Sequence, residues 1–250
     1  MKAQQWMTIA LSTLAIELGL AVASPPSVAQ DMDASDTVFL SCTPPVTNGF
    51  TRCNTQDGDN YLGYLRNGRP SGRGVYVYGS GDRYEGEWEN GLPDGEGRFI
   101  LQNDARFEGV WENGYIVRGS AFYPDGTRYE GTFAPLQYVD SDVVTSQPSG
   151  QGAFYFANGN RFEGEFFVGK PFGQGTFIHT TGTRCSGYFF NLNFDANNAT
   201  CTYPNGQRYT GELRQARPHG VGTMYGTNGQ VVYTGAFREG QPARFSGYGN

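Results

Sequence analysis

Arginine and glutamate recur two residues apart along this chain, in a spacing that could recognise an anion. Arginine stands at six matching positions and glutamate follows two residues later at four of them: Arg83, Arg106, Arg128, Arg161, Arg184 and Arg208, then Glu85, Glu108, Glu130 and Glu163. Residues two apart in a strand share a face, so these side chains form rows of mixed charge. Such rows either keep a sheet soluble and in register, or offer arginines to a carboxylate or a phosphate.

Aromatic residues form a second recurring set that alternates with the charged rows. In 83–88 (RYEGEW) polar and apolar residues alternate strictly, which is typical of a strand with one buried face. Where no second layer covers such a face, the rings either pack along the sheet or bind an apolar helix, a peptide or a sugar ring. The candidate binding residues are these rings, with one tyrosine from an insertion: Tyr84, Trp88, Phe107, Trp111, Tyr129, Phe133, Phe162, Phe166 and Tyr138.

Four cysteines form two local pairs, Cys42 with Cys53 and Cys185 with Cys201. In an exported chain an even set of cysteines indicates disulfides. Cys185 and Cys201 occupy positions where other repeats place aromatics that face each other across a hairpin. The first pair precedes the repeats and could hold a terminal cap. Zinc is the rival interpretation, but no Cys-x-x-Cys or nearby histidine supports it, so we expect no metal.

Signals of catalysis are sparse in this sequence. The two histidines, His179 and His219, fall in a predicted strand and a predicted turn, and no nucleophile elbow, P-loop, zinc-protease or dinucleotide-binding motif is present. We therefore expect a chain that is not an enzyme and needs no cofactor.

The elements that position these residues follow a repeat of about 23 residues. Units begin at Tyr61, Tyr84, Phe107, Tyr129, Phe162, Cys185, Tyr209 and Tyr233, at steps of 23, 23, 22, 33, 23, 24 and 24 residues. A fixed period of this length indicates an array in which each unit depends on its neighbours for a core.

Each unit reads as a β-hairpin. Asn67-Gly68, Asn90-Gly91 and Asn113-Gly114 close the first strands, and four similar pairs close the second: Asp125-Gly126, Asn158-Gly159, Asn205-Gly206 and Asn228-Gly229. Such pairs supply the positive φ that tight hairpin turns require. We expect an all-β fold, an elongated single-layer antiparallel β-meander of tandem hairpin repeats, curved and twisted because strand twist accumulates.

These repeats resemble MORN repeats. The segments 85–96 (EGEWENGLPDGE) and 162–176 (FEGEFFVGKPFGQGT) match the family pattern most closely, and the resemblance covers residues 61 to about 245. It implies a curved single-layer sheet that binds partners, assembles complexes or associates with membranes, without catalytic residues of its own.

Three units depart from the pattern in the turn between their two strands. The third lacks its Gly-x-Gly pair around Arg118, the fourth carries an insertion at 136–149, and the sixth replaces its glycines with 191–198. All three should project from one edge of the sheet, either as a binding edge or as tolerated insertions.

The chain ends and charge define the setting. Residues 1–29 read as a signal peptide cut after Ala23 or Ala29, residues 30–60 as an N-terminal segment and cap, and 61–250 as about eight repeats. Removing 1–29 takes away Lys2 and Glu17, so the formal charge stays at -6, which disfavours nucleic acid. We expect an exported protein, periplasmic or secreted, that acts as a scaffold for a protein or peptide. The alternatives are association with a membrane surface and, less favoured, carbohydrate binding or hydrolysis.

Overall fold

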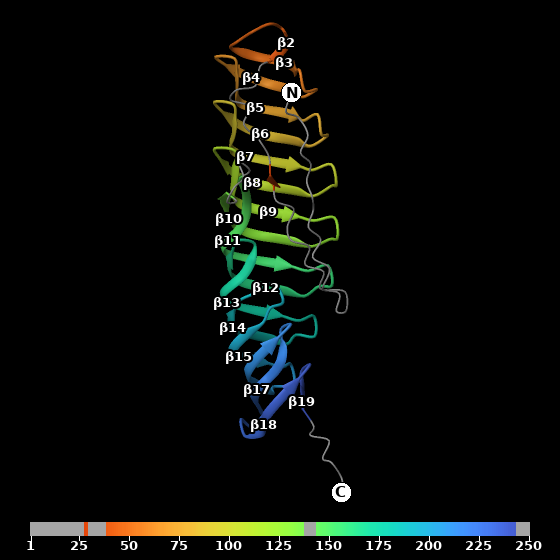
Figure 1. The fold of residues 1–250 in the computed structure, drawn as a ribbon, viewed down its shortest axis with the longest axis vertical. Helices are drawn as coiled ribbons and strands as arrows, with labels where there is room; N and C mark the ends of the chain where they lie inside the picture. The colour runs from red at the N-terminus through yellow and green to blue at the C-terminus, as the bar shows by residue number, and fades with distance from the viewer. Residues whose placement is uncertain (1–27, 30–38, 138–143, 244–250) are drawn as a thin grey trace.

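The protein folds into an elongated stack of β-strands, shown by a computed structural model that describes residues 28–29, 39–137 and 144–243 (Figure 1). The strands lie across the long axis and follow one another from β2 near one end to β19 near the other. No helix occurs among the described residues, and therefore none that could span a membrane. The expected all-β meander is confirmed.

Nineteen strands of the described residues form one sheet. From β2 to β19 each strand pairs antiparallel with the next in sequence, while β1 pairs with β11. The strands are β1 (Val28–Ala29), β2 (Phe39–Thr43), β3 (Gly49–Thr55), β4 (Asn60–Arg66), β5 (Arg69–Val77), β6 (Arg83–Glu89), β7 (Leu92–Ile100), β8 (Arg106–Glu112), β9 (Tyr115–Phe122), β10 (Arg128–Gln137), β11 (Val144–Tyr155), β12 (Arg161–Phe167), β13 (Lys170–Ile178), β14 (Arg184–Phe189), β15 (Ala196–Thr202), β16 (Arg208–Arg214), β17 (Arg217–Tyr225), β18 (Val231–Arg238) and β19 (Gln241–Pro242).

The two kinds of turn differ in their backbone. At Asn90-Gly91 both residues have positive φ, 53° and 91°, as a two-residue hairpin turn requires. At Asp125-Gly126 only the glycine is positive, and the turn is longer: the Tyr123 amide donates to the Thr127 carbonyl. The asparagine or aspartate there accepts from the amide two residues later, as Asp125 does from Thr127 at 2.8 Å. The predicted turns are thus in place, but the second set is not of the tight two-residue type.

Both expected disulfides are present. Cys42 bonds Cys53 across β2 and β3, and Cys185 bonds Cys201 across β14 and β15, where the two residues are direct register partners. The first bridge ties the strand β2 to the sheet ahead of the first repeat. The second lies within the least regular repeat.

The described residues of the insertion, 136–137 and 144–149, are strand rather than loop. Its residues lengthen β10 and β11, with Leu136 paired to Thr145 and Gln137 to Val144, so the hairpin extends beyond its neighbours. Backbone pairing satisfies the inserted amides and carbonyls that a loop would have to expose. The hairpin tip, residues 138–143, and most of the expected signal peptide, residues 1–27, lie outside the described residues.

Candidate binding site

One repeat shows why its residue types recur. Tyr84 is the second residue of β6, and its ring lies over Gly86 and over Gly97 of β7, which are register partners. A Cβ on Gly86 would lie 2.5 Å from the Tyr84 Oη, a contact that real Cβ atoms do not make. The Tyr84 hydroxyl donates to the Glu87 carbonyl at 3.1 Å, beside the register shift between Gly86 and Trp88. The Tyr84 hydroxyl thus bonds the backbone of a β-bulge in its own strand. The bulge bends β6 over the ring of Tyr84.

The same contact recurs in other repeats. The hydroxyls of the first-position tyrosines donate to the carbonyl three residues later at 2.7 to 3.1 Å: Tyr61, Tyr84, Tyr129, Tyr209 and Tyr233. Burial raises the pKa of Tyr209 to about 12, and it raises the pKa values of Tyr61, Tyr84 and Tyr129 as well. These tyrosines are neutral structural donors.

The aromatic residues expected to pack or to bind form the core. The side chains of eight candidates are only 0 to 6% exposed: Tyr84, Trp88, Phe107, Trp111, Tyr129, Phe133, Phe162 and Phe166. Tyr138 lies outside the described residues. The prediction that these eight residues bind a partner therefore needs correction. Their rings pack along the sheet, and burial leaves them no surface for a partner.

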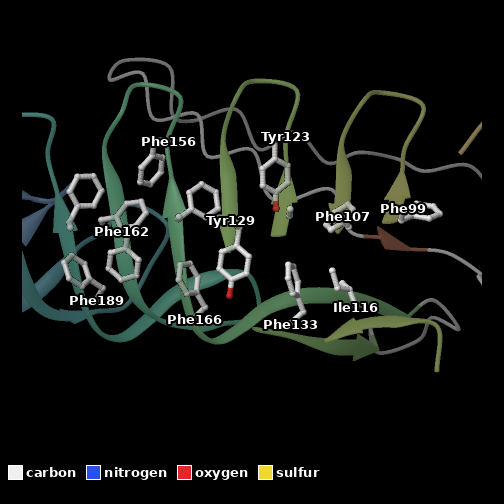
Figure 2. Packing of buried hydrophobic residues seen from close by; sticks show 14 of the residues in the cluster. Phe99, Phe107, Ile116, Tyr123, Tyr129, Phe133, Phe156, Phe162, Phe166 and Phe189 are labelled. Atoms are coloured by element: carbon white, nitrogen blue, oxygen red, sulfur yellow. The ribbon is translucent and has the colours of Figure 1, made fainter. Parts of the chain in front are cut away.

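Neighbouring repeats bury one another's rings. The ring of Tyr84 lies 5.0 Å from that of Trp88 in its own strand and 5.3 Å from that of Trp111 in the next repeat, edge to face in both cases. Figure 2 shows the same arrangement further along, where Tyr129, Phe162 and Phe166 lie in one row. Because each bulge bends its strand, a single sheet can surround these rings without a second layer. Below, the inner face is the face that carries these rings, and the outer face is the opposite one.

The rows of arginine and glutamate lie on the outer face and pair within themselves. Arg106 bonds Glu108 at 3.0 Å, and the Arg128–Glu130 and Arg161–Glu163 pairs repeat this contact at 3.1 and 3.0 Å. Arg106 also stacks on Phe122, with its guanidinium carbon 4.1 Å from the ring centroid. These partners favour the interpretation of a solvated charge ladder over an anion site.

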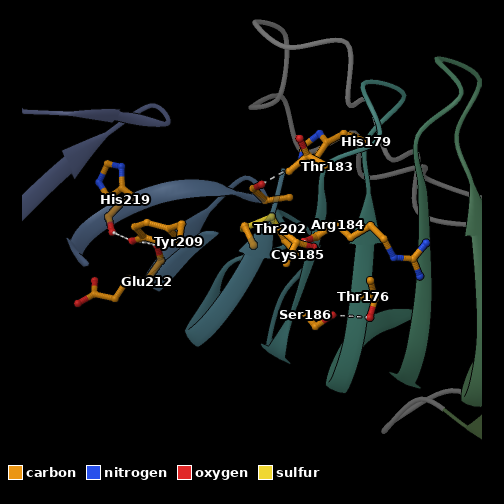
Figure 3. Close-up of a disulfide and its surroundings, with 12 residues drawn as sticks. Thr176, His179, Thr183, Arg184, Cys185, Ser186, Thr202, Tyr209, Glu212 and His219 are labelled. Atoms are coloured by element: carbon orange, nitrogen blue, oxygen red, sulfur yellow. Dashed lines mark hydrogen bonds between the residues drawn. A yellow bond between two sulfur atoms is a disulfide. The ribbon is translucent and has the colours of Figure 1, made fainter. Parts of the chain in front are cut away.

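The charge ladder changes character toward the C-terminus. Where earlier repeats place glutamate, β14 and β16 place Ser186 and Thr210, and the structure gives Arg184 and Arg208 no acidic partner among its described residues. Hydroxyl residues then occupy one cross-strand row over six strands: Thr176, Ser186, Thr200, Thr210, Thr223 and Thr234. Figure 3 shows the Thr176–Ser186 hydrogen bond, of 2.8 Å, beside the Cys185 disulfide.

A groove of about 510 Å³ crosses the outer face of β3 to β7. Its floor is the backbone of three glycines, whose Cβ positions would point to the inner face: Gly74, Gly86 and Gly97. One wall is apolar, with Phe50, Leu62 and Val75. The remaining lining is charged: Arg73, Glu85, Glu96 and Arg98.

The apolar wall of the groove is exposed to solvent. Phe50 is 52% exposed and Leu62 37%, and the adjoining Tyr64 is 54% exposed. The rings of Phe50 and Tyr64 lie 5.3 Å apart, edge to face. At the charged end, Glu85 bonds Arg98 at 2.6 Å. The groove therefore presents fixed apolar side chains beside a formed ion pair, which suits a segment with an apolar anchor and polar flanks.

A second exposed cluster lies on β12 to β14. Phe167, Phe172 and Tyr188 are 63, 46 and 44% exposed, and the ring of Phe172 lies 6.1 Å from Phe167 and 5.8 Å from Tyr188. These residues belong to the outer face, like the wall of the groove.

None of the exposed apolar residues of the groove wall and of the second cluster is among the residues predicted from the sequence to bind. The signal was available, because Leu62, Tyr64 and Tyr188 stand at alternating positions where most other repeats place glutamate, threonine or serine. An apolar residue in the solvated half of an alternating strand is more informative for binding than one in the buried half.

The two histidines occupy different settings. The ring of His179 lies 4.8 Å from that of Phe177, and its Nε2 lies 3.0 Å from the Ala216 carbonyl oxygen, the geometry of an Nε2–H donor. Burial lowers the pKa of His179, and the nearby charge of Arg217 lowers it further. Its role is packing and hydrogen bonding between repeats, while His219 belongs to β17. Among the described residues, no three of His, Cys, Asp and Glu cluster closely enough to share a metal ion.

Comparison with protein families identifies the repeat. The MORN repeat matches residues 61–83, 84–106, 146–161, 162–184 and 209–231. Four of these segments coincide with hairpins of the sheet, and 146–161 covers most of β11 and the turn that follows it. No curated protein sequence matches the chain.

Several solved structures share low overall similarity with the chain. The SAS-4 TCP domain of Drosophila melanogaster, in complex with a proline-rich motif of Ana2, is 13% identical with a TM-score of 0.40, over 66% of this chain and 87% of that one. A variant TCP10 domain of Danio rerio CPAP is 16% identical with a TM-score of 0.30, over 76% and 90%. At TM-scores this low, the similarity carries no conclusion about this chain.

Proposed function

Because the chain belongs to the MORN repeat family, we propose that it is a non-enzymatic binding module that holds a protein or peptide partner in its outer-face groove. The observation that carries this proposal is the apolar wall of Phe50 and Leu62, exposed to solvent at positions that the alternation would otherwise give to polar residues. Exposed apolar clusters beside polar groups are characteristic of interaction sites.

The groove suits a peptide segment better than a flat protein surface. Its glycine floor brings the strand backbone close to an occupant, and its walls differ in character along the sheet. An apolar side chain of the partner would pack on Phe50, Leu62 and Val75, while Arg73 and Glu96 meet the polar flanks. The core tyrosines and His179 have pKa shifts that burial explains, so none of them needs a catalytic role.

The test is affinity capture from envelope and secreted fractions with three forms of the protein. These are the wild type, a groove variant Phe50→Ser/Leu62→Thr, and a control Val221→Thr/Val232→Thr whose residues are 66 and 63% exposed on β17 and β18. We expect the affinity of the groove variant for a captured partner to fall at least about 30-fold, as it does when an anchor residue is removed from an interface. The control should bind that partner as the wild type does. Equal retention by all three proteins would exclude the groove as the binding site.

We also propose that the chain acts outside the cytoplasm. Two disulfides in a chain of this size fit an oxidising compartment. Mass spectrometry of protein from envelope and culture fractions should find a chain that begins at Ser24 or Gln30, with both disulfides formed. A full-length N-terminus with four free thiols in protein from its native source would contradict export.

A further inference from the structure

The C-terminal part of the sheet differs from the N-terminal part in charge. Residues 170–243 contain six basic and three acidic residues, a formal charge of +3. Residues 39–137 contain nine basic and thirteen acidic residues, a formal charge of -4. The C-terminal strands therefore favour an anionic ligand, although the whole chain carries a charge of -6.

Two arginines of this part have no acidic partner among the described residues. Arg184 and Arg208 lie on the outer face of β14 and β16, and both are register partners of Thr202 on β15, which lies between them. Because neighbouring strands lie about 4.8 Å apart, the two Cα atoms are about 10 Å apart. Arg184 is exposed, and Arg208 stacks on Tyr225, with its guanidinium carbon 4.0 Å from the ring centroid. Stacking holds the guanidinium of Arg208 without neutralising its charge.

Two acidic residues of the same face lie nearby without pairing to these arginines. Glu163 on β12 bonds Arg161 at 3.0 Å. Glu212 on β16 is turned toward β17, where a Cβ on Gly220 would meet its carboxylate. The charges of Arg184 and Arg208 are thus left for a ligand.

Neutral polar groups lie beside the two arginines. Ser186, Thr200 and Thr210 form the adjacent row of the outer face, and Figure 3 shows Ser186 next to the Cys185 disulfide. One row further, Tyr188 is the register partner of Asn197, and Tyr188 is 44% exposed. Hydroxyl and amide groups both donate and accept hydrogen bonds, and the tyrosine ring adds an apolar surface with a polar tip.

We propose that the outer face of β14 to β16 binds an acidic polysaccharide, one whose sugars carry carboxylate groups. Arg184 and Arg208 pair with carboxylates of the polymer, because the planar fork of a guanidinium matches the two oxygens of a carboxylate. The hydroxyl row and Asn197 bond the hydroxyl groups of the sugars, and the ring of Tyr188 packs on a sugar ring. Each kind of group on this surface thereby meets a group that such a polymer carries.

An acidic peptide fits this surface less completely. Extended peptides commonly bind a sheet by adding a strand at its edge, whereas β14, β15 and β16 each pair with a strand on both sides. Peptide carboxylates would meet the arginines but would bring few hydroxyl groups to the hydroxyl row. The surface is separate from the groove on β3 to β7, so this binding activity goes beyond the proposed function.

Calorimetric titration of the full 250-residue chain with a galacturonate oligosaccharide tests the role of the arginines. The variant Arg184→Gln/Arg208→Gln removes the two unpaired charges. The matched control Arg106→Gln/Arg128→Gln removes two arginines from the same repeat position, where each has a glutamate partner, so the two variants have equal net charge. We expect the control to bind like the wild type and the Arg184→Gln/Arg208→Gln variant to bind at least about tenfold more weakly.

Two further titrations distinguish a sugar from other anions. Tyr188→Ser should lower the affinity for the galacturonate oligosaccharide at least about threefold, and its melting temperature checks that this variant is folded. An oligoglutamate of the same charge should bind the wild type at least about tenfold more weakly than the oligosaccharide does, because it lacks sugar rings and hydroxyl groups.

Four results would each overturn the proposal. These are no binding of the oligosaccharide by the wild type, equal loss of affinity in the two arginine variants, unchanged affinity in folded Tyr188→Ser, and oligoglutamate binding as tight as that of the oligosaccharide. The last result would assign the surface to an acidic peptide instead. Because the variant Phe50→Ser/Leu62→Thr leaves this surface intact, it should bind the oligosaccharide like the wild type, and failure here leaves the groove proposal standing.

Discussion

The contact between Tyr61 and Gly74 shows at the residue scale what fixes the repeat. A Cβ added to Gly74 would lie 2.6 Å from the Tyr61 Cε2, and Gly74 is the register partner of Gly63. The sixth repeat provides the natural counterpart: its first position is Cys185, and Ala199 stands where the others have the second glycine. Where the ring is absent, the methyl group is accepted. The aromatic residue at the first position and the second glycine of a repeat are therefore coupled: the glycine is needed only where the ring lies over it.

We predict that Gly74→Ala lowers the free energy of unfolding by about 1–3 kcal/mol, because the methyl group overpacks the ring of Tyr61. Tyr61→Leu should also destabilise the protein, since Tyr61 is fully buried. In the double variant the two losses should fall short of additivity by at least about 0.5 kcal/mol, measured by urea denaturation. Additive losses would show that the two residues do not interact as described.

His179 gives a prediction on pH. Its pKa is lowered in the folded state, chiefly by burial, so the unfolded state binds the proton more readily. Its contribution to stability is complete above the unfolded pKa of about 6.5 and is lost as the pH falls below it. The melting temperature of the wild type should therefore fall between pH 7 and 5 more steeply than that of His179→Gln. If the melting temperatures of the two proteins fall in parallel with pH, His179 is not the cause of the loss of stability.

At the scale of single elements, the hairpin of β14 and β15 is the least regular of the sheet. Its connecting segment carries Phe194 into the core, where the ring lies 5.0 Å from Phe177 and 5.3 Å from Phe162. The disulfide between Cys185 and Cys201 closes a separation of 16 residues across this hairpin. It holds together a repeat whose sequence has lost the glycine and tyrosine pattern.

We predict that Cys185→Ser/Cys201→Ser lowers the free energy of unfolding by about 3 kcal/mol, the value expected for a loop of this length. Cys42→Ser/Cys53→Ser should cost a similar amount or less, because its loop of 11 residues is shorter. Denaturant titration of both variants and the wild type measures these losses. If the Cys185→Ser/Cys201→Ser variant is as stable as the wild type, the packing of Phe194 and not the disulfide stabilises the sixth repeat.

The sequence predicted the hairpins well but not whether the aromatic rows are covered, for a physical reason. Alternation and Asn-Gly turns are local, so 83–88 is enough to predict β6 and its inner face. Whether Trp88 is covered depends on the bulge at Gly86 and on the ring of Tyr84, which belong to three-dimensional packing. The pairing of β11 with β1 is likewise beyond local patterns, because it joins residues remote in sequence.

At the scale of the whole molecule, each repeat is buried by its neighbours alone. Trp88 is 2% exposed and its ring lies near those of Tyr61, Tyr76 and Tyr84, all within β4 to β6. Its indole Nε1–H donates to the Gly74 carbonyl at 3.4 Å. No strand pairing within the described residues joins β6 to the last hairpins, so the effect of a change at Trp88 should decay along the sheet.

Trp88→Ala should accordingly destabilise the sheet by about 3–5 kcal/mol locally, through the cavity it leaves and the lost hydrogen bond. Hydrogen exchange should accelerate in β4 to β9 and stay at the wild-type rate in β16 to β18, because an array of repeats opens in units. The matched change further along the sheet, Phe162→Ala, should accelerate exchange in β11 to β15 and leave β4 to β6 at the wild-type rate, since Phe162 packs on Phe166 and Phe189. If either variant accelerates exchange equally in all strands, the sheet unfolds as one cooperative unit. A partner bound at the groove would then stabilise the C-terminal strands as much as β3 to β7, which line the groove.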